Sequence, residues 1–539
     1  MGTATVTVSG SGGATNVDIA ALYLVQSVQQ LDGRIPLIAD RQAVARVFVR
    51  GSRTGIGSVN VRLRFYQGAT LLSTLTGSTT PTLTVDESCC SANIAVPGTL
   101  MQNGVSILAD VDPTNALAES NESDNQYPLS GTPQSLTVVA MPPFNLKLVP
   151  VQQNRTGQAG TATQTLLTMF RSVWPMNVIN VTTRAPLSID YAVTSAGSDA
   201  WVRLVRDVEI ARQTEGSNAY YYGLLRSQAT SGLVGLANGI PALTAIGIDE
   251  QSSFGADESR LTFAHELGHT LSLRHAPCGG AAGPDPNFPF ADGRTGVFGM
   301  DTYANNALKL PSFNDLMTYC SPNEWVSAYY YRKVMDFRVQ NPNGIPQAPS
   351  RVLMVSGRVD AASVALDPSF AVDAPPTRND PNGRFIAEGV AADGRVLFRW
   401  RFTPYRVEDA RQETEAFVVA VPVSAAVQTQ LAQVVVREAG GARGDRRSRA
   451  SGSALRAGSG APVATVKLPG GGSQISWSSS MYPLVLVRDR ITGDVLAIAR
   501  NGTLDLSAFG RADRLQVLMS DGVGSVTYTI DPATGALRQ

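Results

Sequence analysis

Short runs of alternating apolar and polar residues lie toward both ends of this chain, and they constrain its fold more than any other feature. The first set lies between residues 17 and 140 and includes ARVFVRG (Ala45 to Gly51), NVRLRFYQG (Asn60 to Gly68) and QSLTVVAM (Gln134 to Met141). A period of two places successive side chains on opposite faces of a strand, and Gly, Ser, Thr and Pro separate the runs. This part is predicted to be an antiparallel β-sandwich.

Alternation returns after Ile345-Pro346 in two further groups of runs. RVLMVSGRV, RVLFRWRF and AFVVAVPV predict one sandwich, and YPLVLVRD, DVLAIARNGT, RLQVLMSDGV and SVTYTID predict a second. The segment between them, Arg437 to Gly460, is basic and rich in Gly and Ser. We therefore predict that it is a mobile loop or linker.

The residues between these β-rich parts follow a different pattern. A strand, FNLKLVPV (Phe144 to Val151), precedes a helical run from Thr161 to Trp174. A second helix is predicted after Ser198, and a third around Asp257 to Leu273. Strands and helices in this order indicate an α/β unit of about 200 residues.

A chain of 539 residues is too long for one hydrophobic core, so several domains are expected. The predicted fold class is multidomain α+β, with all-β domains on both sides of the α/β unit. The predicted boundaries are 1–140 for an immunoglobulin-like sandwich, 141–342 for the α/β unit, 343–460 for a sandwich with the basic loop at its end, and 461–539 for a C-terminal immunoglobulin-like sandwich.

The charge balance excludes some classes of partner. Lysine plus arginine equals aspartate plus glutamate, 44 and 44, so no net field attracts nucleic acid or an anionic membrane. No stretch approaches the roughly 20 apolar residues that span a bilayer. We expect neither a nucleic-acid partner nor a membrane span. The sequence leaves the oligomeric state open, with a monomer favoured.

All three histidines of the chain lie in the segment HELGHTLSLRH, from His265 to His275. Residues four apart share one face of a helix, so His265 and His269 can present their imidazoles to one ion. Glu266 is placed to reach a water bound to that ion, and His275 reaches it if the helix ends and the chain turns back. Three neutral imidazoles leave a fourth position open for water, which is typical of a catalytic zinc site.

These residues resemble the signature of the metzincin clan of zinc peptidases, HExxHxxGxxH followed by a methionine-containing turn. Ser272 stands where the clan usually has glycine, and we expect a left-handed backbone there. FNDLMTYC resembles the clan's turn, which implies that Met317 gives apolar support beneath the metal. Tyr319 matches a tyrosine that in some members stabilises the transition state, and a plain core or rim tyrosine is the alternative.

The four cysteines bear on the compartment. Cys278 lies three residues after the third histidine and Cys320 three after Met317, so a disulfide between them would join two halves of one site. Two buried free thiols are the alternative. Cys89 and Cys90 are adjacent, and their state is not assigned by the sequence.

An acidic, Asn-rich segment, Ala109 to Pro128, resembles a turn of the immunoglobulin-like modules found beside bacterial surface and secreted enzymes. Such a turn can hold calcium through Asp110, Asp112 or Glu119. A solvated turn without an ion is the interpretation that we favour.

The resemblance implies a secreted bacterial zinc endopeptidase that acts on protein or glycoprotein substrates. A substrate is expected to lie extended along a sheet edge at Leu236, Ala237 and Asn238, because main-chain pairing aligns any peptide. The start MGTATVTVSGSGG lacks the features of a signal peptide, so a secreted or cell-surface chain would begin after a removed signal, and a cytosolic one is the alternative. A competing hypothesis is an adhesion or glycan-binding protein with a zinc site of minor catalytic importance.

Overall fold

The protein is described by a computed structural model that covers residues 14–194, 197–342, 348–450, 464–467, 473–531 and 537–539. It divides into two compact units. The first unit contains residues 1–142, 171–178 and 275–340, and the second contains residues 143–170, 179–274 and 341–539. The four domain boundaries drawn from the sequence stay predictions.

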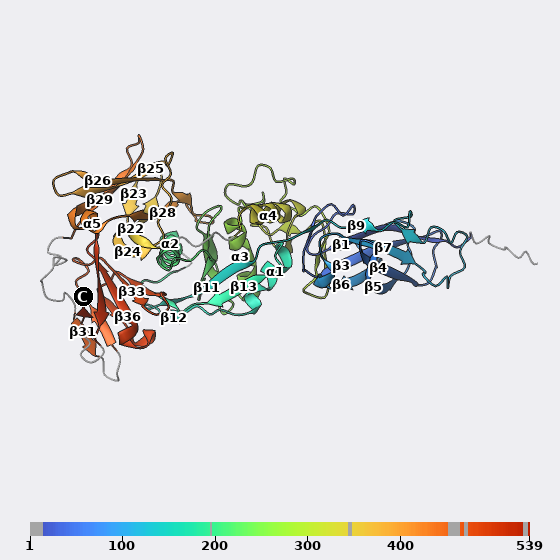
Figure 1. Ribbon diagram of the computed structural model, residues 1–539, viewed down its shortest axis with the longest axis horizontal. Coiled ribbons are helices and arrows are strands. Elements are labelled where there is room, and N and C mark those ends of the chain that lie inside the picture. The colour runs from blue at the N-terminus through green and yellow to red at the C-terminus, as the bar shows by residue number, and fades with distance from the viewer. Residues whose placement is uncertain (1–13, 195–196, 343–347, 451–463, 468–472, 532–536) are drawn as a thin grey trace, which may run out of the picture. The chain divides into compact units, whose positions relative to one another are not determined.

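The first unit contains the predicted N-terminal β-sandwich (Figure 1). Val47, Leu63, Phe65 and Ala109 are fully buried in its apolar core, and they come from the two facing sheets. One sheet has the order β1(Val17–Val25), β3(Ala43–Gly51), β6(Ser91–Val96). The other has the order β5(Thr70–Thr79), β4(Val59–Gln67), β7(Val105–Val111), β8(Gln126–Tyr127), with β9(Gln134–Ser135) on β7.

Short elements complete the first unit. The pairs are β2(Leu37–Ile38) with β10(Val138–Val139), β18(Gly299–Asp301) with β19(Ala307–Lys309), and β20(Asn314–Asp315) with β21(Glu324–Trp325). Helix α4(Ala328–Gln340) follows these strands. Asp315 accepts hydrogen bonds from the amides of Met317 and Ser327, both at 2.8 Å, and so fixes the turn before this helix.

A twelve-stranded sheet runs through the second unit. Its order is β16(Gly235–Ala237), β17(Thr244–Ile248), β15(Tyr220–Leu225), β11(Phe144–Gln153), β14(Leu187–Ile189), β34(Val495–Ala499), β33(Leu484–Asp489), β36(Leu515–Ser520), β37(Ser525–Ile530), β38(Leu537–Arg538), with β12(Gln158–Ala159) and β13(Ile179–Thr183) on β11. Strands β17, β15, β11 and β14 pair in parallel, and β16 pairs antiparallel at the edge. Parallel pairing with helical connections is the arrangement that the order of elements predicts.

Helices α2(Ser198–Thr214) and α3(Ala256–Thr270) lie where the sequence predicts them. The apolar stripe of α2, including Trp201, Leu204 and Val208, is buried in the core of the second unit. The helical run predicted at Thr161 to Trp174 is shorter, consisting of η2(Thr165–Leu167) and α1(Thr168–Val173).

The predicted sandwich after residue 343 is present. One sheet contains β23(Val364–Leu366), β22(Ser350–Val359), β28(Glu415–Pro422), β27(Tyr405–Arg406) and β24(Phe370–Ala374), and the other contains β26(Val396–Phe402), β25(Phe385–Ala391), β29(Leu431–Glu438) and β30(Gly444–Ser448). The short helix α5(Ala425–Gln430) connects β28 to β29. The prediction of a linker from Arg437 to Gly460 is wrong in its first part, because β30 pairs antiparallel with β29. Residues 451–463 lie outside the described residues.

The C-terminal strands are joined to the rest of the second unit. They enclose a core with Ile475, Val485 and Val517, closed by a sheet of β31(Ala464–Lys467), β32(Ser473–Ser476) and β35(Thr503–Asp505). However, β34 pairs in parallel with β14, so one sheet crosses the predicted boundary at 461. The alternation of apolar residues predicts these strands but not their partner. No helix in the described part of the chain is long and apolar enough to cross a membrane.

Candidate metal centre

Helix α3 carries the first two histidines and ends where the motif requires it. Ser272 has φ of 76°, the left-handed conformation expected at this position from the resemblance to the metzincin signature. The Ser272 amide donates to the His269 carbonyl at 3.0 Å, and the Leu273 amide donates to the Gly268 carbonyl at 3.1 Å. These two bonds are the capping pattern that closes a helix through a left-handed residue. The helix therefore ends at Thr270, one residue after the second histidine, with Leu271 as its C-cap.

The imidazoles of His265 and His269 face one carboxylate. Their ring centroids are 4.9 Å apart, and their Nε2 atoms lie 3.5 Å and 3.0 Å from Oδ2 of Asp409. His269 is fully buried, and its Nδ1 lies 2.9 Å from the Leu273 carbonyl oxygen. A carbonyl accepts only from a protonated Nδ1, so the Nε2 lone pair points toward the Asp409 side of the ring.

His275 completes the predicted histidine set. Its Nδ1 lies 2.8 Å from the Ala282 carbonyl oxygen, which directs Nε2 away from that contact as in His269. One ligand atom from each of His265, His269, His275 and Asp409 lies within 4.8 Å of the others. In the part of the chain that the structure describes, this is the one group of His, Cys, Asp and Glu side chains with such spacing. The group could hold a metal ion.

Asp409 was missed by the sequence reasoning. It lies in the loop between β27 and β28, 140 residues after His269, and its φ is 65°. The expected fourth, open position next to the three imidazoles is therefore faced by a protein carboxylate. No local pattern marks this residue, because an aspartate in a polar turn is common. Its left-handed backbone in a non-glycine residue is a structural sign of a constrained position.

Glu266 lies beside these residues, buried with 2% exposure. Burial, followed by the negative charge of Asp409 and a hydrogen bond between the two carboxyl groups, raises the pKa of Glu266 well above its usual range. The charge of Glu408 acts in the same direction. The carboxyl groups of Glu266, Glu408 and Asp409 give this part of the site a negative electrostatic potential.

Strand β16 packs directly against Glu266 through a glycine. A Cβ added to Gly235 would lie 2.4 Å from Oε1 of Glu266 and 2.6 Å from Cγ2 of Thr262. Only glycine allows this approach of the edge strand to the helix. Gly235 was not singled out from the sequence, where it is one of 50 glycines.

The predicted substrate strand lies at the sheet edge as β16 and the residue after it. Leu236, Ala237 and Asn238 are all buried. The Glu408 amide donates to the Ala237 carbonyl at 3.0 Å, and the two residues form an isolated antiparallel bridge. This edge is thus paired by the chain itself at one position.

Met317, Tyr319 and the cysteines Cys278 and Cys320 belong, like His275, to the first unit. Met317 is fully buried, and its carbonyl accepts from the Ala276 amide at 2.9 Å. The ring of Tyr319 meets the ring of His275 edge-on at 4.9 Å between centroids, and Tyr319 is 46% exposed. Cys278 and Cys320 are joined in the predicted disulfide.

Cys89 and Cys90, which the sequence left unassigned, are joined to each other by a disulfide.

In the acidic turn from Ala109 to Pro128, the carboxylates considered as calcium ligands already bond other groups of the protein. Asp110 pairs with Arg62 and Arg64, and Asp112 accepts from the amides of Ala116 and Leu117.

Glu119 accepts from the Val17 amide at 2.6 Å and from Asn125 at 3.0 Å. With Asp110 and Asp112, it belongs to no metal-ligand group found among the described residues. Protein donors already bond these carboxylates, and the solvated turn, with calcium binding as its alternative, stays a prediction.

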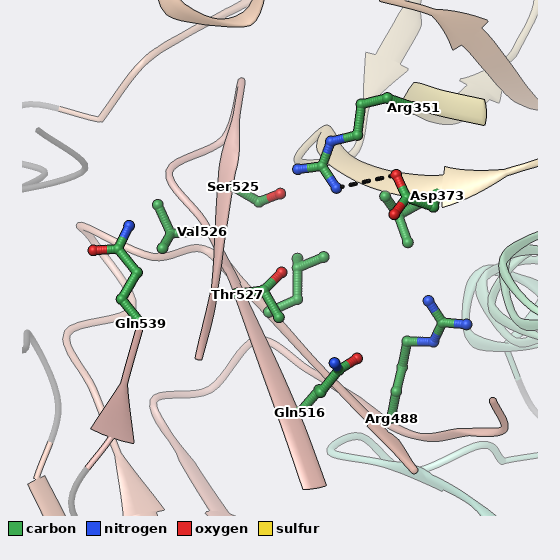
Figure 2. Close-up of a pocket in the computed structure, with 10 residues that line it drawn as sticks. Arg351, Asp373, Arg488, Gln516, Ser525, Val526, Thr527 and Gln539 are labelled. Atoms are coloured by element: carbon green, nitrogen blue, oxygen red, sulfur yellow. Dashed lines mark ion pairs between the residues drawn. The ribbon is translucent and has the colours of Figure 1, made fainter. Parts of the chain in front are cut away.

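A separate cavity of about 430 Å³ lies in the second unit (Figure 2). It is lined by Arg351, Val372, Asp373, Arg488, Gln516, Leu518, Ser525, Val526, Thr527 and Gln539. Figure 2 shows the ion pair between Arg351 and Asp373, whose charged atoms are 3.5 Å apart. The cavity shares no residue with the metal group.

Comparisons with known proteins do not identify a family for this chain. No family model matches the sequence, and no curated protein matches it. Among solved structures, the CARDB domain of the PF1109 protein from Pyrococcus furiosus, described in complex with di-metal ions, is 21% identical, covers 24% of this chain and 96% of that one, and has a TM-score of 0.16. A β-glycosidase from Bacteroides vulgatus is 8% identical, with 95% and 80% covered and a TM-score of 0.14. A β-glucuronidase from Bacteroides uniformis is 10% identical, with 95% and 81% covered and a TM-score of 0.16. Such TM-scores carry no argument about fold or function.

Proposed function

We propose that this chain is a secreted, zinc-dependent endopeptidase with a metzincin-like catalytic site. The observation that carries the proposal is the grouping of His265, His269 and His275 around one point, with Glu266 buried beside them. Helix spacing, the left-handed turn at Ser272 and the disulfide beyond His275 all serve to hold this arrangement.

The residues fit a zinc ion. Imidazole nitrogens and a carboxylate oxygen are the donors that zinc prefers among protein ligands. His269 has its Nδ1 bonded to a carbonyl, the usual support for a metal-binding Nε2. The negative charges that act on Glu266 would be offset by a divalent cation. His265, His269 and His275 would hold the ion.

When bound, zinc supplies a Lewis acid that activates water and polarises a peptide carbonyl. Glu266 accepts the proton of the attacking water on its carboxylate and passes it to the leaving amine nitrogen. Met317 would give apolar support near His275, and Tyr319, whose ring meets that of His275, would donate to a developing oxyanion.

A protein or glycoprotein substrate would pair with β16, because an edge strand aligns an extended peptide whatever its side chains. Secretion agrees with the two disulfides, which persist in oxidising compartments. A monomer without nucleic-acid partners is the state that we propose.

The test uses the full chain loaded with zinc and incubated with denatured casein. Glu266→Gln is expected to keep one zinc per chain and to lower peptide release about a thousandfold, because a positioned base contributes roughly 10² to 10⁴. Glu258→Gln, on the same helix, is the matched control and is expected to match the unchanged chain. Full activity in Glu266→Gln would contradict the role of this residue.

Zinc retention separates ligand loss from loss of the base. His269→Ala is expected to lower the zinc content measured by elemental analysis, because it removes a buried ligand. Equal zinc content in this variant would contradict the assigned metal site.

Adhesion or glycan binding remains the competing hypothesis. It predicts no casein cleavage with zinc bound, and glycan binding by the intact chain. A buried glutamate beside the histidines favours the peptidase, because a purely structural zinc site requires no base.

A further inference from the structure

A short segment of the second unit lies against the proposed catalytic residues. Residues 407–410, here named the strap, follow β27 and precede the exposed residues Arg411, Gln412 and Glu413. Val407 is buried with 2% exposure in the core of the unit, and its amide donates to the Thr414 carbonyl at 2.9 Å. The strap is therefore anchored to its sandwich at its start.

The strap meets two parts of the site through consecutive residues. Its Glu408 amide bonds the carbonyl of Ala237 on β16, in antiparallel orientation. The next residue, Asp409, places its carboxylate 3.0 Å from His269 and 3.5 Å from His265. An extended peptide that pairs with β16 would use the same carbonyl and reach the same imidazoles.

The proposed base lies next to the helix histidines that Asp409 faces, since Glu266 follows His265 directly in the chain. Glu266 must face a water molecule for peptide hydrolysis. Asp409 thus faces the two helix histidines, where water and substrate would have to be.

We infer that the strap is a built-in inhibitor of the proposed peptidase: Asp409 occupies the position of the attacking water, Glu408 occupies the substrate edge, and both must move away before a peptide can bind. This inference rests on the proposed function. The strap bonds β16 through the Glu408 amide and is followed by an exposed tip, Arg411 to Glu413.

The test measures access to the metal without relying on turnover. Cobalt(II) replaces zinc in the full chain, and acetohydroxamate, a small chelating ligand, is titrated while the cobalt absorption bands are followed. Asp409→Ala and the isosteric Asp409→Asn are expected to bind acetohydroxamate at least tenfold more tightly than the unchanged chain, with altered cobalt bands. Glu413→Gln, at the exposed tip of the same loop, is the matched control and is expected to leave both unchanged.

Two outcomes would overturn the inference. Equal acetohydroxamate affinity and equal cobalt spectra in all four proteins would show that Asp409 does not block the metal. Loss of cobalt from both Asp409 variants would show that this residue is a permanent ligand required for metal binding.

Casein cleavage separates this inference from the proposed function. Release of peptides at least tenfold faster by zinc-loaded Asp409→Ala supports both. Equal rates in Asp409→Ala and the unchanged chain contradict the inhibitor while the peptidase stands. No cleavage by either, with zinc bound, contradicts the peptidase itself, and tighter acetohydroxamate binding by Asp409→Ala would then still support a blocked metal.

A reversible cross-link tests displacement directly. Ala237 and Glu408 face each other in an antiparallel bridge, a spacing that a disulfide spans. The double variant A237C/E408C, once oxidised, is expected to cleave casein at least tenfold more slowly than after mild reduction. The unchanged chain given the same reductant is the control. Equal rates in the oxidised and reduced double variant would contradict a strap that must move.

Discussion

At the scale of single residues, Gly235 is the position where the sheet edge and the proposed base come closest. An added Cβ would lie 2.4 Å from the Glu266 carboxylate, so Gly235→Ala must displace that group. We expect zinc content to be kept and casein cleavage to fall roughly ten- to a hundredfold, because small misplacements of reacting groups have effects of this size. Gly57→Ala, where an added Cβ meets nothing within 4 Å, is the control. Unchanged cleavage in Gly235→Ala would contradict this placement of Glu266.

Single residues also show which parts of the site a sequence can predict. His265 and His269 follow from helix geometry, because a four-residue spacing places two side chains on one face, and the turn at Ser272 follows from the resemblance to the metzincin signature. Asp409 comes from a distant loop, and its contact with the histidines depends on tertiary packing that no local spacing encodes.

At the scale of elements, Glu388 connects three strands of the 343–450 sandwich. It lies on β25 and accepts from Arg399 on β26 at 2.7 Å and from Arg437 on β29 at 3.1 Å. The hydrogen bonds from Arg437, together with those from Arg399, hold the pKa of Glu388 below its ordinary value of 4.5. Its contribution to stability is therefore full above pH 4.5 and is lost as the pH falls through the lowered pKa.

We expect Glu388→Gln to lower the free energy of unfolding by about 1 kcal/mol at pH 7, since both arginines are partly exposed to solvent. Urea unfolding at pH 7 and at pH 3 measures the effect, with Glu413→Gln as the control. The difference between variant and unchanged chain should shrink at pH 3. A difference that grows toward low pH would contradict the sign of the shift.

The positions of strands in the sequence were predicted better than the strands with which they pair. Alternation predicts β33, β34, β36 and β37 as strands, although β34 is buried on both faces, and it contains no information on which edge they join. The pairing of β34 with β14 joins residues about 300 apart in the chain, so the boundary predicted at residue 461 places two strands of one sheet in different domains. Gly444 to Ser448 was predicted to be linker because the segment around it is basic and rich in Gly and Ser, but backbone pairing with β29 outweighs that composition.

At the scale of the whole molecule, the C-terminal strands are a structural part of the second unit. Arg500 pairs with buried Asp207 of α2 at 2.8 Å, and β34 covers the edge of β14. A chain ending at residue 450 would leave that edge unpaired and that carboxylate without its arginine. We expect this shortened chain to aggregate, as measured by gel filtration. A soluble shortened chain that cleaves casein normally would contradict this dependence.

The central claim is that the three histidines and Glu266 form the catalytic centre of a zinc peptidase. Its most direct test is the rate of casein cleavage by the zinc-loaded Asp409→Ala chain, compared with the same chain that also carries Glu266→Gln. We predict chelator-sensitive cleavage by the first and a rate about a thousandfold lower in the second, with zinc retained in both. Absence of cleavage in the first, or equal rates in the two, would contradict the claim.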